Sequence, residues 1–206
     1  RLAKDFKPNR MDVAKDVIVD FIDARPNDRI GLVIFGGVAF TQCPLTSDHK
    51  VLKNMFTQVK AGSLDQGTAI GLGLATAVAR IKESKAKSKV IVFVSDGVNN
   101  VGEVAPLTAG ELAKTYGIRV YCIGVGSKGK ALQPVAIYAP GEYEYDYVDV
   151  DVDEKVMTEI SEMTGGQYFR ATNKESLVNI YQEIDKMEKT IVSEKSFTNN
   201  AEHFLP

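Results

Sequence analysis

Three short apolar segments limit the possible folds of this chain more than any other feature of its sequence. They are rich in β-branched residues, each is soon followed by glycine, and they span Ile30–Phe35, Val90–Val94 and Ile118–Ile123. Segments of this length and composition, bounded by glycine, predict strands that are buried on both faces. Strands covered on both faces belong mostly to parallel sheets with helices on each side. The sequence therefore predicts an α/β fold.

Segments with helical periodicity alternate with these strands. In the first of them, apolar residues recur every three or four positions and therefore share one helix face. These residues are Met11, Ala14, Val17, Ile18 and Phe21. Further helices are expected at residues 51–56, 69–81, 108–116, 153–163 and 174–187.

Three more segments have the composition of short strands. Residues 38–43 are expected to pair antiparallel with Ile30–Phe35 across a Gly36-Gly37 turn. The other two are residues 167–170 and 190–197. Together these patterns predict a doubly wound α/β sheet, mostly parallel, with one antiparallel edge strand and helices on both faces.

Length and charge exclude several classes of protein. The chain has 206 residues, with 25 Lys and Arg against 27 Asp and Glu, for a net charge of −2. This balance argues against nucleic-acid binding, which depends on excess positive charge. No apolar run reaches the roughly 18–20 residues needed to cross a bilayer. The two cysteines, Cys43 and Cys122, fall within expected strands and fit neither a disulfide framework nor a zinc motif.

A hydroxyl and a carboxylate form the most informative pair of residues in the sequence. Thr68 ends the segment Ser63–Thr68 just before a helix rich in small residues, and Asp96 follows the strand at Val90–Val94. Open parallel sheets bind ligands at the carboxyl ends of their strands, where both residues are expected. Their oxygens suit Mg²⁺ or Ca²⁺. Spacing alone favours a simpler interpretation, in which Thr68 caps the helix and Asp96 opens a tight Asp-Gly turn.

Motifs for other kinds of site lack the surrounding residues that those sites require. Gly124–Gly129 has the glycine spacing of a dinucleotide site, but residues 130–147 contain two prolines and no helical period. Asp149–Asp153 alternates like a calcium loop, but the glycine and glutamate that such a loop requires are missing in either register. No motif for a nucleophilic enzyme occurs. We therefore do not expect an enzyme; a nucleotide-binding oxidoreductase at Gly124–Gly129 is the alternative in that class.

A series of motifs in a fixed order resembles the von Willebrand factor type A domain. The resemblance covers about Leu2–Lys189, and its opening, Leu2–Arg10, is most similar to bacterial Bat (Bacteroides aerotolerance) membrane proteins of the BatA/BatB type. The segments that carry it are Asp28–Gly36, Ala39-Phe40, Pro44–Thr46, Gly67-Thr68, Val92–Gly97, Ile123–Gly126 and Thr164–Tyr168. We expect residues 1–189 to form this domain and residues 190–206 to be a strand or linker that leads toward a membrane segment.

The resemblance implies a metal-ion-dependent adhesion site (MIDAS). In that family, one loop carries Asp-x-Ser-x-Ser, a second a threonine and a third an aspartate, and together they hold one divalent cation. By position, Thr68 and Asp96 are the second-loop and third-loop ligands. The implied cation is Mg²⁺, with Ca²⁺ or Mn²⁺ as alternatives, and it keeps an open position for a carboxylate of the partner.

Five further residues are expected to contact the partner: Gly67, Ser95, Gly97, Tyr143 and Tyr145. The two tyrosines lie in Lys128–Asp151, a segment too long for a bare connection, which we expect to determine specificity. The alternative is an antiparallel hairpin that covers a sheet edge.

The sequence departs from the family pattern at its start. The family's first strand and its Asp-x-Ser-x-Ser loop, central in the fold between Ile30–Phe35 and Val90–Val94, are missing before Arg1. Because the chain also begins without Met, we expect it to be part of a longer protein. Residues 190–197 are the only internal segment expected to be able to take the place of this strand. We therefore expect this chain to bind divalent metal weakly or not at all.

The expected function is protein–protein recognition without catalysis, with a role in stress or aerotolerance implied by the Bat resemblance. The partner is expected to be another protein that presents an acidic side chain, and nucleic acid is not an expected partner. The same resemblance implies a tether to the bacterial inner membrane by segments outside this chain, with the domain on the periplasmic side. A metal-free structural module inside a larger complex is a further alternative.

Overall fold

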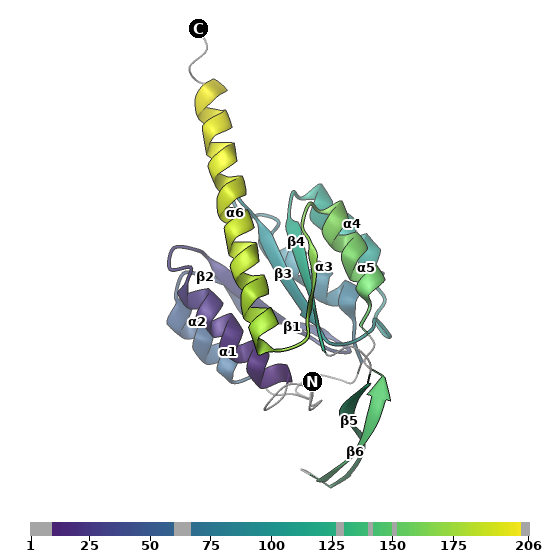
Figure 1. Ribbon diagram of the computed structural model, residues 1–206. Helices are drawn as coiled ribbons and strands as arrows, with labels where there is room; N and C mark the ends of the chain where they lie inside the picture. Colours follow the sequence, from purple (N-terminus) through teal and green to yellow (C-terminus); the bar gives the residue numbers. More distant parts are fainter. Residues whose placement is uncertain (1–9, 60–66, 127–129, 140–141, 150–151, 203–206) are drawn as a thin grey trace.

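The computed structural model describes residues 10–59, 67–126, 130–139, 142–149 and 152–202. It has a central sheet between two groups of helices (Figure 1). In chain order, the elements are α1 (Arg10–Asp23), β1 (Ile30–Phe35), β2 (Ala39–Thr46), α2 (His49–Thr57), α3 (Ile70–Ile81), β3 (Val90–Ser95), α4 (Pro106–Thr115), β4 (Arg119–Val125), β5 (Lys130–Ala139), β6 (Glu142–Asp149), α5 (Glu154–Met163), β7 (Tyr168–Ala171) and α6 (Lys174–Glu202).

The strands follow the expected doubly wound arrangement. Parallel pairing joins three of them in the order β3-β4-β7. Beside them, β1 pairs antiparallel with β2, the edge strand expected after the Gly36-Gly37 turn. The prediction of an α/β sheet with one antiparallel edge strand and helices on both faces is therefore confirmed.

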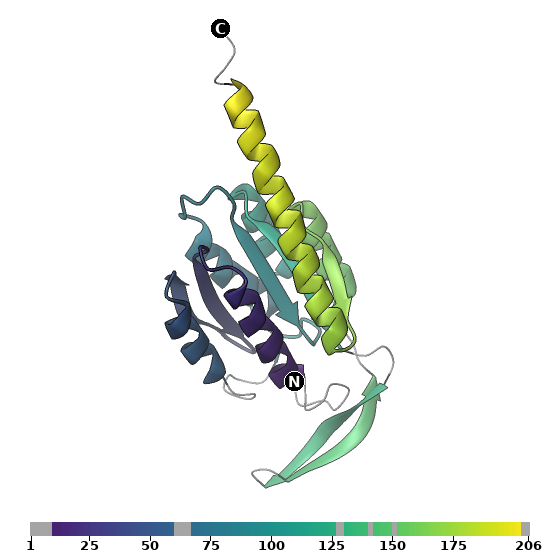
Figure 2. The same ribbon diagram turned by 60° about the vertical axis from the view of Figure 1, so that its left-hand side comes forward.

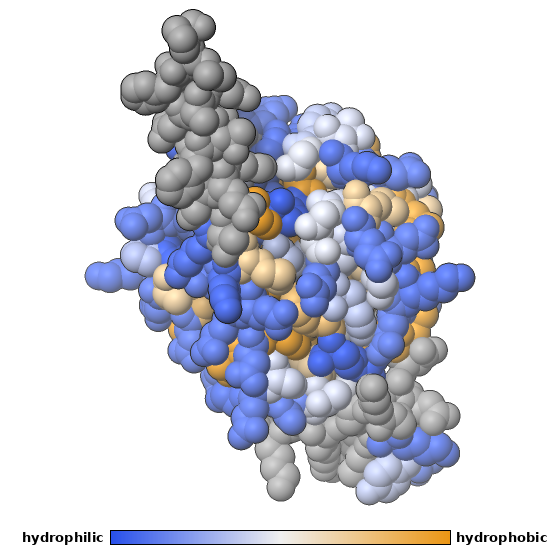
Figure 3. All heavy atoms as spheres, turned by 45° about the horizontal axis from the view of Figure 1, so that its top comes forward, coloured by the Kyte–Doolittle hydropathy of each residue, from blue (hydrophilic) through white to orange (hydrophobic). Residues whose placement is uncertain are grey.

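Alternate residues of β4 enter two separate apolar cores, which explains why this strand is apolar nearly throughout. Val120 and Cys122 belong to the core that contains α3, α4 and α5, whereas Tyr121 and Ile123 belong to the core beneath α1 and α6. Each of these four side chains is at most 1% exposed. Outside the cores, the face seen in Figure 3 is mainly hydrophilic, as expected for helices with one apolar side.

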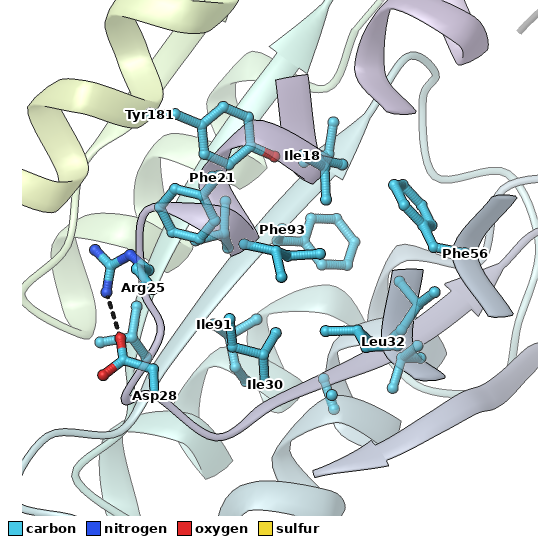
Figure 4. A pocket seen from close by; sticks show the side chains of 18 of the residues that line it. Ile18, Phe21, Arg25, Asp28, Ile30, Leu32, Phe56, Ile91, Phe93 and Tyr181 are labelled. Carbon is cyan, nitrogen blue, oxygen red and sulfur yellow. Dashed lines mark hydrogen bonds and ion pairs between the residues drawn. The ribbon is translucent and has the colours of Figure 1, made fainter. Parts of the chain in front are cut away.

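A cavity of about 1200 Å³ lies between β1 and β3. Figure 4 shows its apolar lining, to which Ile30 and Leu32 contribute from β1 and Ile91 and Phe93 from β3. Among the described residues, β1 pairs only with β2, and β3 only with β4. An extended segment between them would therefore find backbone partners on both sides. The cavity lies where the resemblance places the first strand of the family.

The expected strand at residues 190–197 is wrong. These residues continue α6, which runs from Lys174 to Glu202 and extends beyond the sheet (Figure 2). Its 29 residues include neither glycine nor proline. Nothing in the local sequence ends the helix, so cooperative elongation outweighs the strand propensity of the β-branched residues near Thr190. Residues 190–197 thus do not fill the cavity. Despite its length, α6 lacks the apolar stretch of a membrane span, as do the other helices of the described ranges.

The strands β5 and β6 form an antiparallel hairpin. The hairpin projects away from the sheet at the end of the domain where α1 begins (Figures 1 and 2). The antiparallel hairpin of the alternative interpretation is therefore present, but its strands pair with each other and with neither β2 nor β7, so it does not extend the edge of the central sheet.

A buried carboxylate attaches α6 to the start of β4. The Glu188 side chain accepts hydrogen bonds from Arg119 Nε (2.6 Å), Tyr121 Oη (2.7 Å) and Ser88 Oγ (2.9 Å). Burial raises the pKa of the Glu188 carboxyl, but the bonds from Arg119 and Tyr121 outweigh burial and hold the pKa below its ordinary value. Folding therefore favours the charged form. The resulting stability is present above the pKa of the unfolded state and is lost as the pH falls through the folded-state value.

We expect Glu188→Gln to lower the free energy of unfolding at pH 7 by about 3 kcal/mol, because Arg119 would lose its buried anion. The substitution should also remove the part of the acid sensitivity that begins near the ordinary carboxyl pKa of 4.5. Urea unfolding at a series of pH values measures both effects. Glu183→Gln, at an exposed position of the same helix, is the matched control and should change neither. Equal urea midpoints for Glu188→Gln and the wild type at pH 7 would contradict the role assigned to this carboxylate.

Candidate metal-dependent recognition site

The two loops that carry Thr68 and Asp96 lie side by side. Thr68 precedes α3, and Asp96 directly follows β3. A methyl group placed on Gly97 would lie only 3.0 Å from Thr68 Oγ1. The threonine hydroxyl is thus next to the residue that follows Asp96. The structure therefore brings the predicted pair of oxygen donors to one edge of the sheet.

Thr68 is not the helix cap that spacing alone suggests. Helix α3 begins at Ile70, and its N-cap residue is Ala69, which makes no side-chain cap bond. The backbone N–H of Ala69 instead donates to Gly36 O at 2.8 Å, which ties the loop to the end of β1. The Thr68 hydroxyl lies against the Asp96-Gly97 turn, so the capping interpretation of this threonine is wrong.

Two asparagines that were not predicted as site residues hold the Thr68 loop in place. Asn100 Oδ1 accepts a hydrogen bond from Thr68 N (2.8 Å), and Asn100 N donates to Thr68 O (3.1 Å). Asn99 Oδ1 accepts from Ile70 N (2.9 Å) and so caps α3 from a neighbouring loop. The one available signal was the residue type, since asparagine is favoured at helix N-termini.

An arginine lies against the Asp96 carboxylate. Arg10 is the first residue of α1, and its Nη1 is 3.7 Å from Asp96 Oδ2. The same nitrogen donates to Asp96 O at 3.4 Å. The Arg10 side chain is 4% exposed and that of Asp96 is 22% exposed. Both residues line the cavity between β1 and β3. Arg10 closes the family-like segment Leu2–Arg10, but its residue type and position alone predict no role for it.

The small residues beside the two donors shape their loops. Gly67 has a φ of +115°, and a Cβ there would lie 2.7 Å from Val101 Cγ2, so a side chain would be strained as well as obstructed. Ser95 is buried, and its Oγ accepts a hydrogen bond from Gly97 N at 3.4 Å. These three expected partner contacts, Gly67, Ser95 and Gly97, therefore fix the backbone around the donors.

The other two expected partner contacts lie in the hairpin. Tyr143 and Tyr145 both belong to β6, but their side chains are outside the described part of the structure. Tyr147, on the same strand, is 66% exposed.

The oxygen donors match a hard cation in type but not in number. Thr68 offers a hydroxyl and Asp96 a carboxylate, whereas Mg²⁺ takes about six ligands in octahedral geometry. Within the ranges that the structure describes, no group of three or more His, Cys, Asp and Glu side chains could hold a metal ion. The described residues therefore fit part of a divalent site and do not complete it.

The remaining sequence motifs form no site among the described residues. The element after β4 is the strand β5, so Gly124–Gly129 lacks the helix N-terminus that a dinucleotide requires. Cys43 and Cys122 are free and buried, as expected. Burial raises the pKa of the Cys122 thiol to about 12, which keeps it protonated and unreactive at neutral pH.

We expect Asn99→Ala to lower the free energy of unfolding by about 1–2 kcal/mol, because the buried N–H of Ile70 would lose its acceptor. Chemical denaturation at neutral pH measures this loss. The matched control is Asn54→Ala, at an exposed position of α2, which should leave stability unchanged. An Asn99→Ala protein as stable as the wild type would show that α3 does not depend on this bond.

Comparison with known proteins supports the observed fold. The family model of the von Willebrand factor type A domain matches residues 3–183. BatB from Bacteroides thetaiotaomicron is 31% identical, with a TM-score of 0.74 over 91% of this chain and 93% of that chain. An aerotolerance-related membrane protein from Bacteroides fragilis is 30% identical, with a TM-score of 0.74 over 90% and 92% of the two chains.

More distant proteins share the fold. One is proximal thread matrix protein 1 from the mussel byssus, solved with a zinc-occupied MIDAS motif, which is 22% identical with a TM-score of 0.66 over 88% of this chain and 41% of that chain.

Among curated sequences, an uncharacterized protein of Borreliella burgdorferi is 31% identical over 87% of this chain and 52% of its own length. The chain thus spans about half the length of the curated relatives it matches. The family match and the observed fold agree, and the chain belongs to the von Willebrand factor type A domain family.

Proposed function

We propose that this domain recognises another protein through a divalent cation at the C-terminal edge of its sheet. The observation that carries the proposal is the position of Thr68 Oγ1 against the Asp96-Gly97 turn, which brings together two loops far apart in the sequence. Thr68 and Asp96 are the proposed ligands, with Mg²⁺ as the expected ion and Ca²⁺ or Mn²⁺ as alternatives. This is a role in recognition and not in catalysis.

The contribution of the chain is to hold two hard oxygen donors in a fixed arrangement. When bound, the cation supplies an electrophilic position that a partner carboxylate can occupy. Asn100 bonds the Thr68 backbone through both its side chain and its N–H. Because the Thr68 loop is already held in place, ligand binding has a smaller entropic cost of ordering it.

The β5–β6 hairpin is the second part of the proposed recognition surface. It projects from the end of the domain where α1 begins, which is also where Arg10 contacts Asp96 (Figure 1). Its register places positions 143, 145 and 147 on one face of β6 and positions 142, 144 and 146 on the other. Exposed tyrosines are enriched at protein interfaces, and Tyr147 is 66% exposed. We assign partner contact to this face, including Tyr143 and Tyr145.

The relatives suggest the cellular setting of this function. Two proteins from Bacteroides at 30% and 31% identity are named BatB or described as aerotolerance-related. We propose a Bat-type protein that is tethered to the bacterial inner membrane by segments outside this chain, presents the domain on the periplasmic side and acts in stress tolerance. The partner is another protein with an accessible acidic side chain.

One observation favours a second candidate, a metal-free module within a larger complex. The guanidinium of Arg10 already places a positive charge beside Asp96. Such a module would bind its partner through its surface without an ion, and neither Thr68 nor Asp96 would be needed.

Single substitutions distinguish these two candidates. In the full-length protein, Thr68→Ala and Asp96→Ala should each abolish Mg²⁺-dependent capture of the partner from membrane extracts, and EDTA should do the same to the wild type. Thr115→Ala and Asp20→Ala, at exposed positions away from the site, are matched controls and should retain capture. Capture by the Thr68→Ala and Asp96→Ala proteins at the wild-type level would favour the metal-free module and exclude the proposed site.

We expect the 206-residue chain to bind Mg²⁺ weakly or not at all, because its described residues supply two of the roughly six oxygens that the ion takes. Isothermal titration calorimetry measures the affinity directly. Tight binding with 1:1 stoichiometry would show that the donors of this chain are sufficient and that our account of an incomplete site is wrong.

A further inference from the structure

We infer that Arg10 competes with a divalent cation for Asp96, so that the chain carries its own antagonist of ion binding. The inference deepens the proposed function and rests on it for the location of the cation site. It concerns Arg10 alone, a residue outside the proposed set of metal ligands.

The position of Arg10 next to Asp96 is fixed by burial and hydrogen bonding. Its side chain is 4% exposed, and Nη1 lies 3.7 Å from Asp96 Oδ2 while donating to Asp96 O at 3.4 Å. Arginine is always charged in proteins, and a buried guanidinium requires nearby anionic or carbonyl oxygens. Asp96 supplies both kinds of oxygen. The carboxylate proposed as a metal ligand therefore also takes part in neutralising Arg10.

Electrostatic repulsion between the Arg10 guanidinium and a divalent ion on Asp96 weakens binding of the ion. An Mg²⁺ ion on Asp96 Oδ2, at the usual distance of about 2.1 Å, could lie no more than about 6 Å from Arg10 Nη1, given the 3.7 Å separation. Repulsion between charges of +2 and +1 at that distance weakens binding about tenfold even at the dielectric constant of water. Because Arg10 is buried, solvent screens its charge less than that of a surface arginine.

The geometry also connects ion binding to the start of α1. Arg10 is the first residue of that helix and lines the cavity between β1 and β3. An ion that binds the Asp96 carboxylate must either displace the Arg10 guanidinium or bind beside it. In the first case, the first turn of α1 loses this ion pair and hydrogen bond to the residue that follows β3.

The test compares the Mn²⁺ affinity of variants of the full-length protein, measured by the loss of the free-ion signal in electron paramagnetic resonance. Arg10→Met keeps an unbranched aliphatic stem and removes the charge, Arg10→Gln also removes the charge, and Arg10→Lys keeps it. The matched control is Arg29→Gln, an exposed arginine that donates to Leu45 O. Circular dichroism verifies that each variant is folded.

We expect Arg10→Met and Arg10→Gln to bind Mn²⁺ at least about tenfold more tightly than the wild type, from the repulsion estimated above. Arg10→Lys and Arg29→Gln should remain close to the wild type. Affinities of the two neutral variants equal to the wild-type value would overturn the inference. A gain in Arg10→Lys as large as in Arg10→Met would also overturn it, because packing and not charge would then be responsible.

The result is independent of the test of function. Unchanged ion affinity in the neutral variants rejects competition by Arg10 and leaves the proposed site standing if Thr68→Ala abolishes partner capture. A gain in Arg10→Met that persists in the double variant with Thr68→Ala supports competition and removes Thr68 from the ligand set.

A second measurement keeps the inference testable if the neutral variants do not fold. In the wild-type full-length protein, the guanidinium ¹⁵N resonance of Arg10 should shift during a Mg²⁺ titration up to tens of millimolar, and the midpoint of this shift should equal the midpoint of ion binding. A resonance that stays in place while the ion binds would overturn the inference.

Discussion

The backbone of residues 68–70 links the two parts of the sheet. No hydrogen-bonded pairing joins β1 to β3 among the described residues, and a cavity lies between them. The loop before α3 bonds to both sides: Ala69 N donates to Gly36 O after β1, and Thr68 N donates to Asn100 Oδ1 after β3. Helix α3 then packs beneath both strands, where Gly73 leaves room for the Phe35 ring. The same short segment therefore positions the strands and presents the Thr68 hydroxyl.

Most of the fold could be predicted because its determinants are local or periodic. The strands at Ile30, Val90 and Ile118 combine β-branched composition with glycine at their ends, and the structure places β1, β3 and β4 there. The proximity of Thr68 and Asp96 followed from a rule of topology, since parallel strands present their carboxyl ends at one edge. Neither inference needed knowledge of a particular side-chain contact.

What the sequence did not reveal depends on partners distant in the chain. Asn99 caps a helix that begins 29 positions earlier, so no capping pattern exists in the local sequence. Arg10 and Asp96 are separated by 86 positions, and each has an ordinary role when considered alone. Residues 190–197 have strand-like composition, but they follow a helix with no residue to end it, and helix elongation prevails. Prediction was weakest wherever cooperative or tertiary interactions compete with local preference.

The double attachment of residues 68–70 has a thermodynamic consequence. A ligand that binds Thr68 and Asp96 together contacts the loop of residues 68–70, which is hydrogen-bonded to the segments that follow both β1 and β3. Because the unfolded chain does not hold these loops together, such a ligand binds the native state selectively, and linkage adds its binding free energy to that of folding. Occupancy of this small polar edge would then raise the melting temperature of the entire domain, whose apolar cores the ligand never touches.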